Sequence, residues 1–243
     1  MKIAVIIQAR MGSTRLAGKV LLPLGDRSVL GQVIKRIQHV PQITHVCVAT
    51  TTSQADDLIE QEAERYGVLC WRGSQEDVLQ RYYEAARHIG ADHIIRITSD
   101  CPLIAPDVVA EVVRLHLETG ADYTSNVLIR RYPRGLDTEV FTMKSLQEAY
   151  DEAKLPFERE HVTPFINLQE QRYKLENYIP DYDYSQYRWT LDTHEDYELL
   201  RIMFDRLDRP GQLLDWRSAV RLMEQEPNLP LINSEVEQKK LGQ

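Results

Sequence analysis

Cysteine is scarce in this sequence, and long apolar runs are missing. The three cysteines, Cys47, Cys70 and Cys101, are odd in number and widely spaced. They therefore fit neither a disulfide framework nor a zinc site. No apolar run approaches the ~20 residues that a membrane-spanning helix needs, and the first residues lack the pattern of a signal peptide. These absences predict a cytoplasmic protein that has no membrane partner.

An excess of positive charge is also missing. The 29 Lys and Arg residues are outnumbered by 37 Asp and Glu residues, which gives a formal net charge of -8. Without a basic patch interleaved with aromatic residues, this balance argues against a nucleic-acid partner. The 243 residues show no repeat and no linker, and they are 43% hydrophobic and 27% charged. Such a chain is long enough to bury a substantial core, and we predict one domain over 1–243.

The segment 3–24 organises the rest of the chain. It begins with a wholly apolar strand, 3–7, and a second apolar run follows at 20–24. A strand without alternating polar residues is typical of the middle of a parallel sheet, where both faces are covered. Between the two runs lies a loop that is rich in glycine, hydroxyl groups and cations: Arg10, Gly12, Ser13, Thr14, Arg15, Gly18 and Lys19. This loop should lie over the carboxyl edge of the sheet, where α/β proteins bind ligands.

The composition of this loop suits a polyphosphate. Glycine lets backbone N–H groups approach phosphate oxygens, while Arg and Lys neutralise their charge. The loop is not a Walker A motif, because five residues separate Gly12 from Gly18 and Val20 stands where the motif needs a hydroxyl. A solvated basic loop is the simpler interpretation, but it does not explain why glycines and cations gather at the end of a strand.

Strands and helices alternate through the first half of the chain. Apolar runs predict strands at 45–50, 68–71 and 93–98, and helical periodicity predicts helices over 26–40, 55–66, 75–89 and 106–119. Ser28 is the expected N-cap of the first helix, and Ser74 with Asp77 gives a capping signature for the third. The alternation predicts an α/β fold with a doubly wound, mostly parallel sheet.

The alternation stops near residue 123. The next segment, 123–180, is expected to form a small β/α extension of the sheet, with short strands at 123–126, 138–142 and 172–179 and helices at 144–153 and 157–165. We expect this extension to carry contacts to the second substrate and to a second copy of the chain. The last elements are predicted to be a strand at 187–191, a helix ending near 207 and an amphipathic helix over 215–226.

Two carboxylates should meet the basic loop. Asp100 follows the strand 93–98, and Asp192 follows the apolar run 187–191. If both runs are parallel strands of one sheet, both acids reach the same edge, and two carboxylates completed by phosphates and water are what Mg²⁺ prefers. Asp100 alone would also suit a turn, and Asp192 could pair with Glu195 instead. A helix cap does not require Asp192, because Thr193 and Asp196 supply a capping box one residue later.

Three segments resemble the sugar cytidylyltransferase family. Q-A-R-M-G-S-T-R-L-x-G-K-V-L-L-P-L resembles the family's N-terminal signature, although Ala17 stands where the family usually has Pro. S-D-C-P-L and L-D-T-x-E-D-Y resemble its two later acidic motifs. The nearest branch looks like the spore coat polysaccharide biosynthesis protein F group, which is related to CMP-keto-acid-sugar synthetases. The resemblance implies a nucleotidyltransferase-type sheet, Rossmann-like and GT-A-like, and transfer of CMP from CTP to a sugar acceptor.

The resemblance also assigns roles to residues. Catalytic roles would fall to Arg10, Arg15, Lys19 and Asp100, and Mg²⁺ would be held by Asp100 and Asp192. The residues expected to bind the nucleotide are Gln8, Ala9, Arg10, Gly12, Ser13, Thr14, Arg15, Lys19, Thr50, Thr51, Thr52 and Ser99. The residues expected to bind the sugar acceptor are Arg134, Asp137, Glu139, Arg159, Glu160 and His161. Glu76 and Arg81 also look family-like, whereas helix capping accounts for Asp77.

Two other functions fit the same pattern. A glycosyltransferase that uses a nucleotide-sugar donor would have a related sheet, but its usual D-x-D motif is not complete at S-D-C-P. A nucleotide-binding protein without turnover is the second alternative. No general base is evident; His161 is the one side chain that we nominate. The other six histidines are predicted to lie apart from partners.

Overall fold

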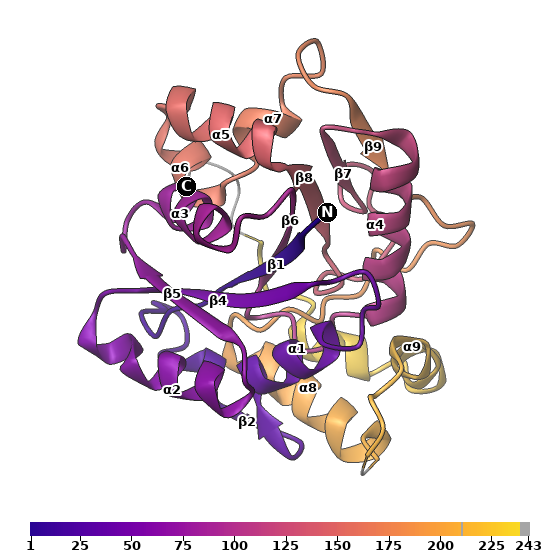
Figure 1. The fold of residues 1–243 in the computed structure, drawn as a ribbon. Helices are drawn as coiled ribbons and strands as arrows, with labels where there is room; N and C mark the ends of the chain where they lie inside the picture. Colours follow the sequence, from indigo (N-terminus) through magenta and orange to yellow (C-terminus); the bar gives the residue numbers. More distant parts are fainter. Residues whose placement is uncertain (210, 239–243) are drawn as a thin grey trace.

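The computed structural model describes residues 1–209 and 211–238. A central seven-stranded sheet has the strand order β5-β4-β1-β6-β8-β7-β9 (Figure 1). Its strands are β1 (Ile3–Gln8), β4 (His45–Thr51), β5 (Leu69–Gly73), β6 (His93–Thr98), β7 (Tyr123–Ser125), β8 (Glu139–Thr142) and β9 (Leu175–Asn177). β8 pairs antiparallel with β6 and with β7, and the remaining pairings are parallel. The prediction of a mostly parallel α/β sheet is confirmed.

Helices cover both faces of this sheet (Figure 1). The α-helices are α1 (Val29–Ile37), α2 (Asp57–Arg65), α3 (Val78–Ile89), α4 (Pro106–Thr119), α5 (Met143–Glu152), α6 (Pro156–His161), α7 (Pro164–Asn167), α8 (His194–Leu207) and α9 (Trp216–Gln225). Shorter elements are η1 (Lys19–Leu21), η2 (Gln54–Asp56), η3 (Leu229–Asn233) and a small hairpin of β2 (Pro23–Leu24) and β3 (Arg27–Ser28).

The alternating side chains of β1 enter two separate apolar layers. Val5 and Ile7 pack with residues of α1, α2 and α4 on one face. Ala4 and Ile6 pack with residues of α3, α5 and α7 on the other face. Because both faces are covered, the strand must be apolar throughout, as its sequence is. A third apolar layer joins α8 and α9 to the segment around Trp189.

The predicted N-cap of the first helix is confirmed, but both the first and the third helix begin later than the predicted ranges 26–40 and 75–89. Ser28 caps α1, since its hydroxyl accepts a hydrogen bond from the Gly31 N–H at 2.8 Å. Helix α3 was expected from residue 75 but begins at Val78, because Asp77 is its N-cap and accepts from the Gln80 N–H at 2.9 Å. Ser74 caps the preceding turn instead, accepting from the Asp77 N–H at 3.1 Å.

The single helix predicted over 157–165 is wrong. The segment forms two short helices, α6 and α7, and the break falls at Val162, whose φ of 71° is outside the helical region. Pro164 contributes to the break, because proline has no N–H and so cannot donate a hydrogen bond to continue α6. The break changes the chain direction immediately after Glu160 and His161.

Two of the histidines expected to be isolated form a pair. His93 Nδ1 lies 3.0 Å from His116 Nε2, and His116 Nδ1 lies 3.0 Å from the Thr124 hydroxyl. Burial lowers the pKa of His116 to about 4, and the charge of His93 lowers this pKa further. His116 is therefore a neutral histidine that folding buries.

This burial predicts a loss of stability in acid. An unfolded histidine takes up a proton near pH 6.5, whereas folded His116 resists it until about pH 4, so unfolding becomes easier as the pH falls through this window. We expect the free energy of unfolding to drop by about 3 kcal/mol from pH 7 to pH 4 on this account. In His116→Gln this part of the pH dependence should be absent. Urea titrations of both proteins at several pH values measure it, and parallel pH profiles would contradict the prediction.

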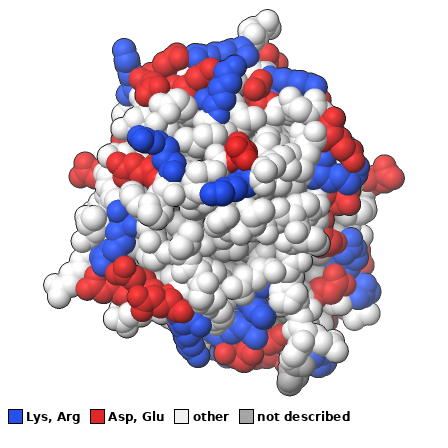
Figure 2. Space-filling model, viewed as in Figure 1, with Lys and Arg blue, Asp and Glu red and all other residues white. Residues whose placement is uncertain are grey.

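Charged side chains are dispersed over the surface. On the face shown in Figure 2, Lys and Arg alternate with Asp and Glu around the rim, and uncharged residues cover much of the middle. None of the helices in the described ranges has the length and apolar character needed to cross a membrane.

Candidate functional site

Asp56 anchors the loop that follows β1. This carboxylate accepts a hydrogen bond from the Met11 N–H at 2.8 Å and is also bonded to the hydroxyls of Thr50 and Thr51. These hydrogen bonds outweigh burial and lower the pKa of Asp56. The loop then closes on itself, because the Gly18 N–H donates to the Met11 carbonyl and Gly18 takes a φ of 66°. Its cations are thus held over the end of β1.

Asp100 and Asp192 converge on Lys19. The Lys19 ammonium donates to Asp100 Oδ2 at 3.0 Å, to Asp192 Oδ1 at 2.8 Å and to the Leu191 carbonyl at 2.6 Å. Arg15 Nη2 lies 2.9 Å from the same oxygen of Asp192. Two acids that are 92 positions apart in the sequence therefore share one edge of the sheet with two cations of the loop.

Asp192 reaches this edge without the strand that the sequence predicted. The segment 187–191 pairs with no strand of the sheet, and its one ladder contact is an isolated bridge between Arg134 and Arg188. The Leu191 N–H instead donates to the Asp100 carbonyl at 2.8 Å, which fixes the two acidic segments side by side. The apolar run is explained by burial, because Trp189 and Leu191 pack against α8 and α9.

A cap and a buried ion pair hold Asp192 in place. As predicted, Thr193 and Asp196 form the capping box of α8, which leaves the side chain of Asp192 free to face the loop. Arg188 donates to Asp192 Oδ2 at 2.7 Å and to Asp196 Oδ1 at 2.9 Å. Its side chain is 9% exposed, so the pair is largely shielded from water.

The charges of this cluster reinforce one another. Burial alone would lower the pKa of Lys19, but Asp100 and Asp192 outweigh burial and raise it. Burial alone would raise the pKa of Asp192, but Lys19, Arg15 and Arg188 lower it. At neutral pH the cluster therefore holds a fully charged ammonium between carboxylates.

The cluster forms one wall of a pocket of about 440 Å³. Most of the residues expected from the sequence line this pocket: Gln8, Ala9, Arg10, Gly12, Ser13, Thr14, Arg15, Lys19, Ser99, Asp100, Arg134, Asp137, Glu160, His161 and Asp192. The lining also includes residues that sequence reasoning missed or set aside, namely Gln75, Glu76, Arg81, Arg96, Thr98, Thr190 and Gln238. Glu76 and Arg81 could have been predicted, because they resemble residues of the family. Nothing in the sequence predicts that Thr190 or Gln238 lines the pocket.

Thr50, Thr51 and Thr52, at the end of β4, were expected to bind the nucleotide but do not line the pocket. Thr50 and Thr51 are 0% and 1% exposed and are bonded to Asp56. Thr52 is exposed but is also absent from the lining. The hydroxyls of Thr50 and Thr51 bond to Asp56, and Asp56 in turn accepts from the Met11 N–H. These two threonines therefore support the loop after β1 through Asp56.

Glu139 and Arg159 also lie outside the pocket lining. Glu139 is buried, pairs with Arg96 and accepts hydrogen bonds from Tyr123 at 2.8 Å and Thr163 at 2.6 Å. Arg159 bonds to Asp77, the N-cap of α3, and to the Tyr150 carbonyl in α5, so it fastens α6 to both helices. Both side chains hold neighbouring elements together.

Gly135 is required where the pocket approaches the segment that carries Asp192. Its φ is 103°, and an added Cβ would lie 2.7 Å from the carbonyl carbon and oxygen of Trp189. Backbone atoms cannot move aside as a flexible side chain can. We expect Gly135→Ala to lower the free energy of unfolding by about 2–3 kcal/mol, since strain and overpacking act together. Thermal denaturation tests this, with Gly67→Ala as a control at a φ of 65° in open space.

The donor set fits magnesium that arrives with a nucleotide. No group of three or more His, Cys, Asp or Glu residues suited to a metal occurs within 1–209 and 211–238. Mg²⁺ is commonly held by one or two carboxylates and completed by substrate phosphates and water. Asp100 and Asp192 supply two carboxylates, and the cationic loop lies beside them.

An open α/β sheet with a basic loop and two acids at its carboxyl edge is typical of an α/β protein that binds a phosphorylated ligand at that edge. The family model described as "Cytidylyltransferase" matches residues 4–229, and the chain belongs to this family. This result confirms the resemblance noted in the sequence.

Similar proteins extend over nearly the whole chain. An uncharacterized protein of Methanocaldococcus jannaschii, MJ1063, is 37% identical over 98% of this chain and 97% of its own. The spore coat polysaccharide biosynthesis protein SpsF of Bacillus subtilis is 33% identical over 84% of this chain and 88% of its own. A solved cytidylyltransferase from Leptospira borgpetersenii has a TM-score of 0.90 and 34% identity, with 99% of both chains covered. CMP:2-keto-3-deoxy-manno-octonic acid synthetase complexed with CTP shares the fold, with a TM-score of 0.66 and 19% identity over 85% of this chain and 99% of that one.

Proposed function

We propose that this protein transfers CMP from CTP to a sugar acceptor and releases pyrophosphate. The observation that carries the proposal is the convergence of Lys19, Asp100 and Asp192 in the wall of one pocket. An acceptor oxygen attacks the α-phosphorus, the bond to the β-phosphate oxygen breaks, and the acceptor's proton is lost. This reaction needs positioning and charge stabilisation more than covalent chemistry from the protein.

Each charged group then has a defined task. Arg10, Arg15 and Lys19 stabilise the triphosphate and the departing pyrophosphate. Asp100 and Asp192 would hold Mg²⁺, which when bound supplies Lewis acidity at the phosphate. His161 lines the pocket, and burial lowers its pKa, so its imidazole is neutral at pH 7 and can accept a proton.

The acceptor is proposed to be an acidic keto-sugar or a sugar phosphate. Arg134 lines the pocket, and burial together with the neighbouring Arg130 lowers its pKa. A guanidinium whose charged form is disfavoured in this way gains from an anionic partner, which a carboxylate or phosphate on the sugar would provide. The likeness to SpsF supports a role in the synthesis of a surface or spore-coat polysaccharide.

Pyrophosphate release from CTP tests the proposal. The protein is incubated with CTP, Mg²⁺ and a panel of keto-acid sugars and sugar phosphates, and a CMP-sugar product is sought by mass spectrometry. Release of CMP or UDP from a nucleotide-sugar would favour a glycosyltransferase instead. Binding of CTP without a product from any acceptor would favour a nucleotide-binding protein that lacks turnover.

A further inference from the structure

The two carboxylate oxygens of Asp100 have different kinds of partner. The Thr98 hydroxyl donates to Oδ1 at 2.6 Å, and the Cys101 thiol lies 3.6 Å from the same oxygen as a second, weaker donor. The Lys19 ammonium donates to Oδ2 at 3.0 Å. Neutral groups next to Asp100 in the sequence thus hold one oxygen, and a cation of the loop after β1 binds the other.

The oxygens of Asp192 are divided in the same way. Arg188 donates to Oδ2 at 2.7 Å, whereas Lys19 donates to Oδ1 at 2.8 Å and Arg15 lies 2.9 Å from Oδ1. Arg188 is itself fixed, because its Nε donates at 2.9 Å to Asp196, whose side chain is 0% exposed. The segment that precedes α8 therefore holds one oxygen of Asp192, and the loop binds the other.

This division directs one oxygen of each acid at a common point. Asp100 Oδ2 and Asp192 Oδ1 both lie within 3.0 Å of the Lys19 nitrogen. The last torsion of an Asp side chain is broad, so a carboxylate without a partner on its second oxygen rotates readily. Mg²⁺ demands near-ideal octahedral geometry, and carboxylates that are already oriented lose less freedom when they bind it.

We propose that Thr98 and Arg188 are positioning residues for the metal that arrives with the nucleotide. Each bonds to the oxygen of its acid that does not contact Lys19, and so presents the other oxygen for Mg²⁺. Hydrogen-bond partners of metal-binding carboxylates change metal affinity about 10–100-fold when they are removed. This inference rests on the proposed use of CTP with Mg²⁺.

Thr98 is suited to a test because its hydroxyl serves no other element. Among residues 1–209 and 211–238, the hydrogen-bond partners of this hydroxyl are Asp100 and Cys101, both in the segment that follows β6. Thr98→Val keeps the shape of the side chain, and Thr98→Ser keeps the hydroxyl. Both keep the charge of the site, so a change in Mg²⁺ binding reports the orientation of Asp100.

Calorimetry without an acceptor sugar tests the inference. The affinity for CTP is measured for each protein at saturating MgCl₂ and again in EDTA, and the ratio of the two affinities reports how strongly the acids hold the metal. Thr98→Val should lower this ratio about tenfold relative to the wild type, with the affinity in EDTA changed by less than about twofold. Thr98→Ser should restore the wild-type ratio.

Arg188→Lys is the second variant. Lysine keeps the positive charge, but its ammonium lacks the planar fork with which Arg188 bonds to Asp192 and Asp196 together. The ratio should again fall about tenfold. The melting temperature should fall as well, because buried Asp196 loses part of its pairing.

Thr44→Val is the matched control for Thr98→Val. Thr44 precedes β4, and its hydroxyl bonds to the N–H and the carbonyl of Ile3, the first residue of β1, at 3.0 Å each. It therefore lies at the amino edge of the parallel strands, opposite the pocket. The same substitution at this edge should lower stability and leave the ratio unchanged.

A folded Thr98→Val or Arg188→Lys protein that keeps the wild-type ratio would overturn the positioning role of the residue that it replaces. If one of the two does not fold, the other still decides. A wild type that binds CTP equally well with and without Mg²⁺ would overturn the inference for both residues. The proposed function fails separately, if the wild type binds CTP but releases no pyrophosphate with any acceptor; a wild type that binds no CTP would overturn both.

Discussion

Asp100→Asn and Asp192→Asn are each expected to reduce pyrophosphate release from CTP about 10³-fold. Asparagine keeps the size of the side chain but removes the negative charge that pairs with Lys19 and that would hold Mg²⁺ under the proposed function. The loss of one preorganised electrostatic group at a reacting phosphate lowers turnover roughly 10²–10³-fold. For a residue that would hold the metal, we expect the larger of these two values. Initial rates at saturating CTP and Mg²⁺ measure the effect.

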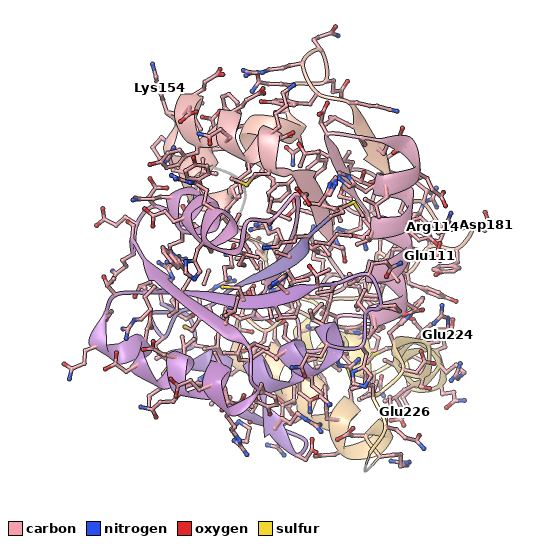
Figure 3. All side chains as sticks on the ribbon, viewed as in Figure 1. Glu111, Arg114, Lys154, Asp181, Glu224 and Glu226 are labelled. Atoms are coloured by element: carbon pink, nitrogen blue, oxygen red, sulfur yellow. The ribbon has the colours of Figure 1, made fainter. Side chains whose placement is uncertain are left out.

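The two variants should differ in stability. Asp192 accepts from Lys19, Arg15 and Arg188, whereas Asp100 pairs with Lys19 alone among these cations. Asp192→Asn therefore leaves more buried positive charge without compensation, and its melting temperature should fall further. Asp181→Asn is the control, since Figure 3 shows Asp181 at the periphery of the molecule. Near-normal turnover in both site variants would overturn the assignment of these acids.

The sequence predicted the site best where chain topology decides geometry. Parallel strands bring their carboxyl ends to one edge, so the loop after β1 and Asp100 after β6 had to be neighbours once the alternation of elements was recognised. The position of Asp192 was predicted for a partly wrong reason. Its apolar run is buried against α8 and α9 and is no strand of the sheet, although a strand and a buried extended segment have the same composition.

The failures concern the direction of side chains. Thr50 and Thr51 follow one another on β4, but both hydroxyls reach Asp56, a residue that no pattern linked to them. Glu139 and Arg159 looked like free polar groups, yet Arg96 and Asp77 neutralise them. Such pairings join residues far apart in the sequence, and a charge pattern along one segment contains no information about them.

Lys19→Met is expected to reduce turnover about 10²–10³-fold and to strengthen the binding of Mg²⁺ in the absence of nucleotide. The first effect follows because the departing pyrophosphate loses a positively charged partner. The second follows because the Lys19 ammonium bonds to the carboxylates of Asp100 and Asp192, which are the residues that would hold Mg²⁺. Without the ammonium the two carboxylates repel each other, and a cation relieves the repulsion. At an effective dielectric of about 20, two charges about 4 Å apart interact by about 4 kcal/mol. Since about 1.4 kcal/mol corresponds to a tenfold change in affinity, we expect Lys19→Met to bind Mg²⁺ at least tenfold more tightly than the wild type.

Thermal denaturation with increasing MgCl₂ measures this competition directly. Lys19→Met should unfold at a lower temperature than the wild type without Mg²⁺ and should gain more stability from the ion, because binding to the folded state alone stabilises it. Lys154→Met, whose side chain projects from the outer edge of the molecule in Figure 3, should respond like the wild type. An identical response of Lys19→Met and the wild type to Mg²⁺ would mean that the ion does not bind between Asp100 and Asp192. A loss of turnover in Lys19→Met would then reflect only the contact with the phosphates.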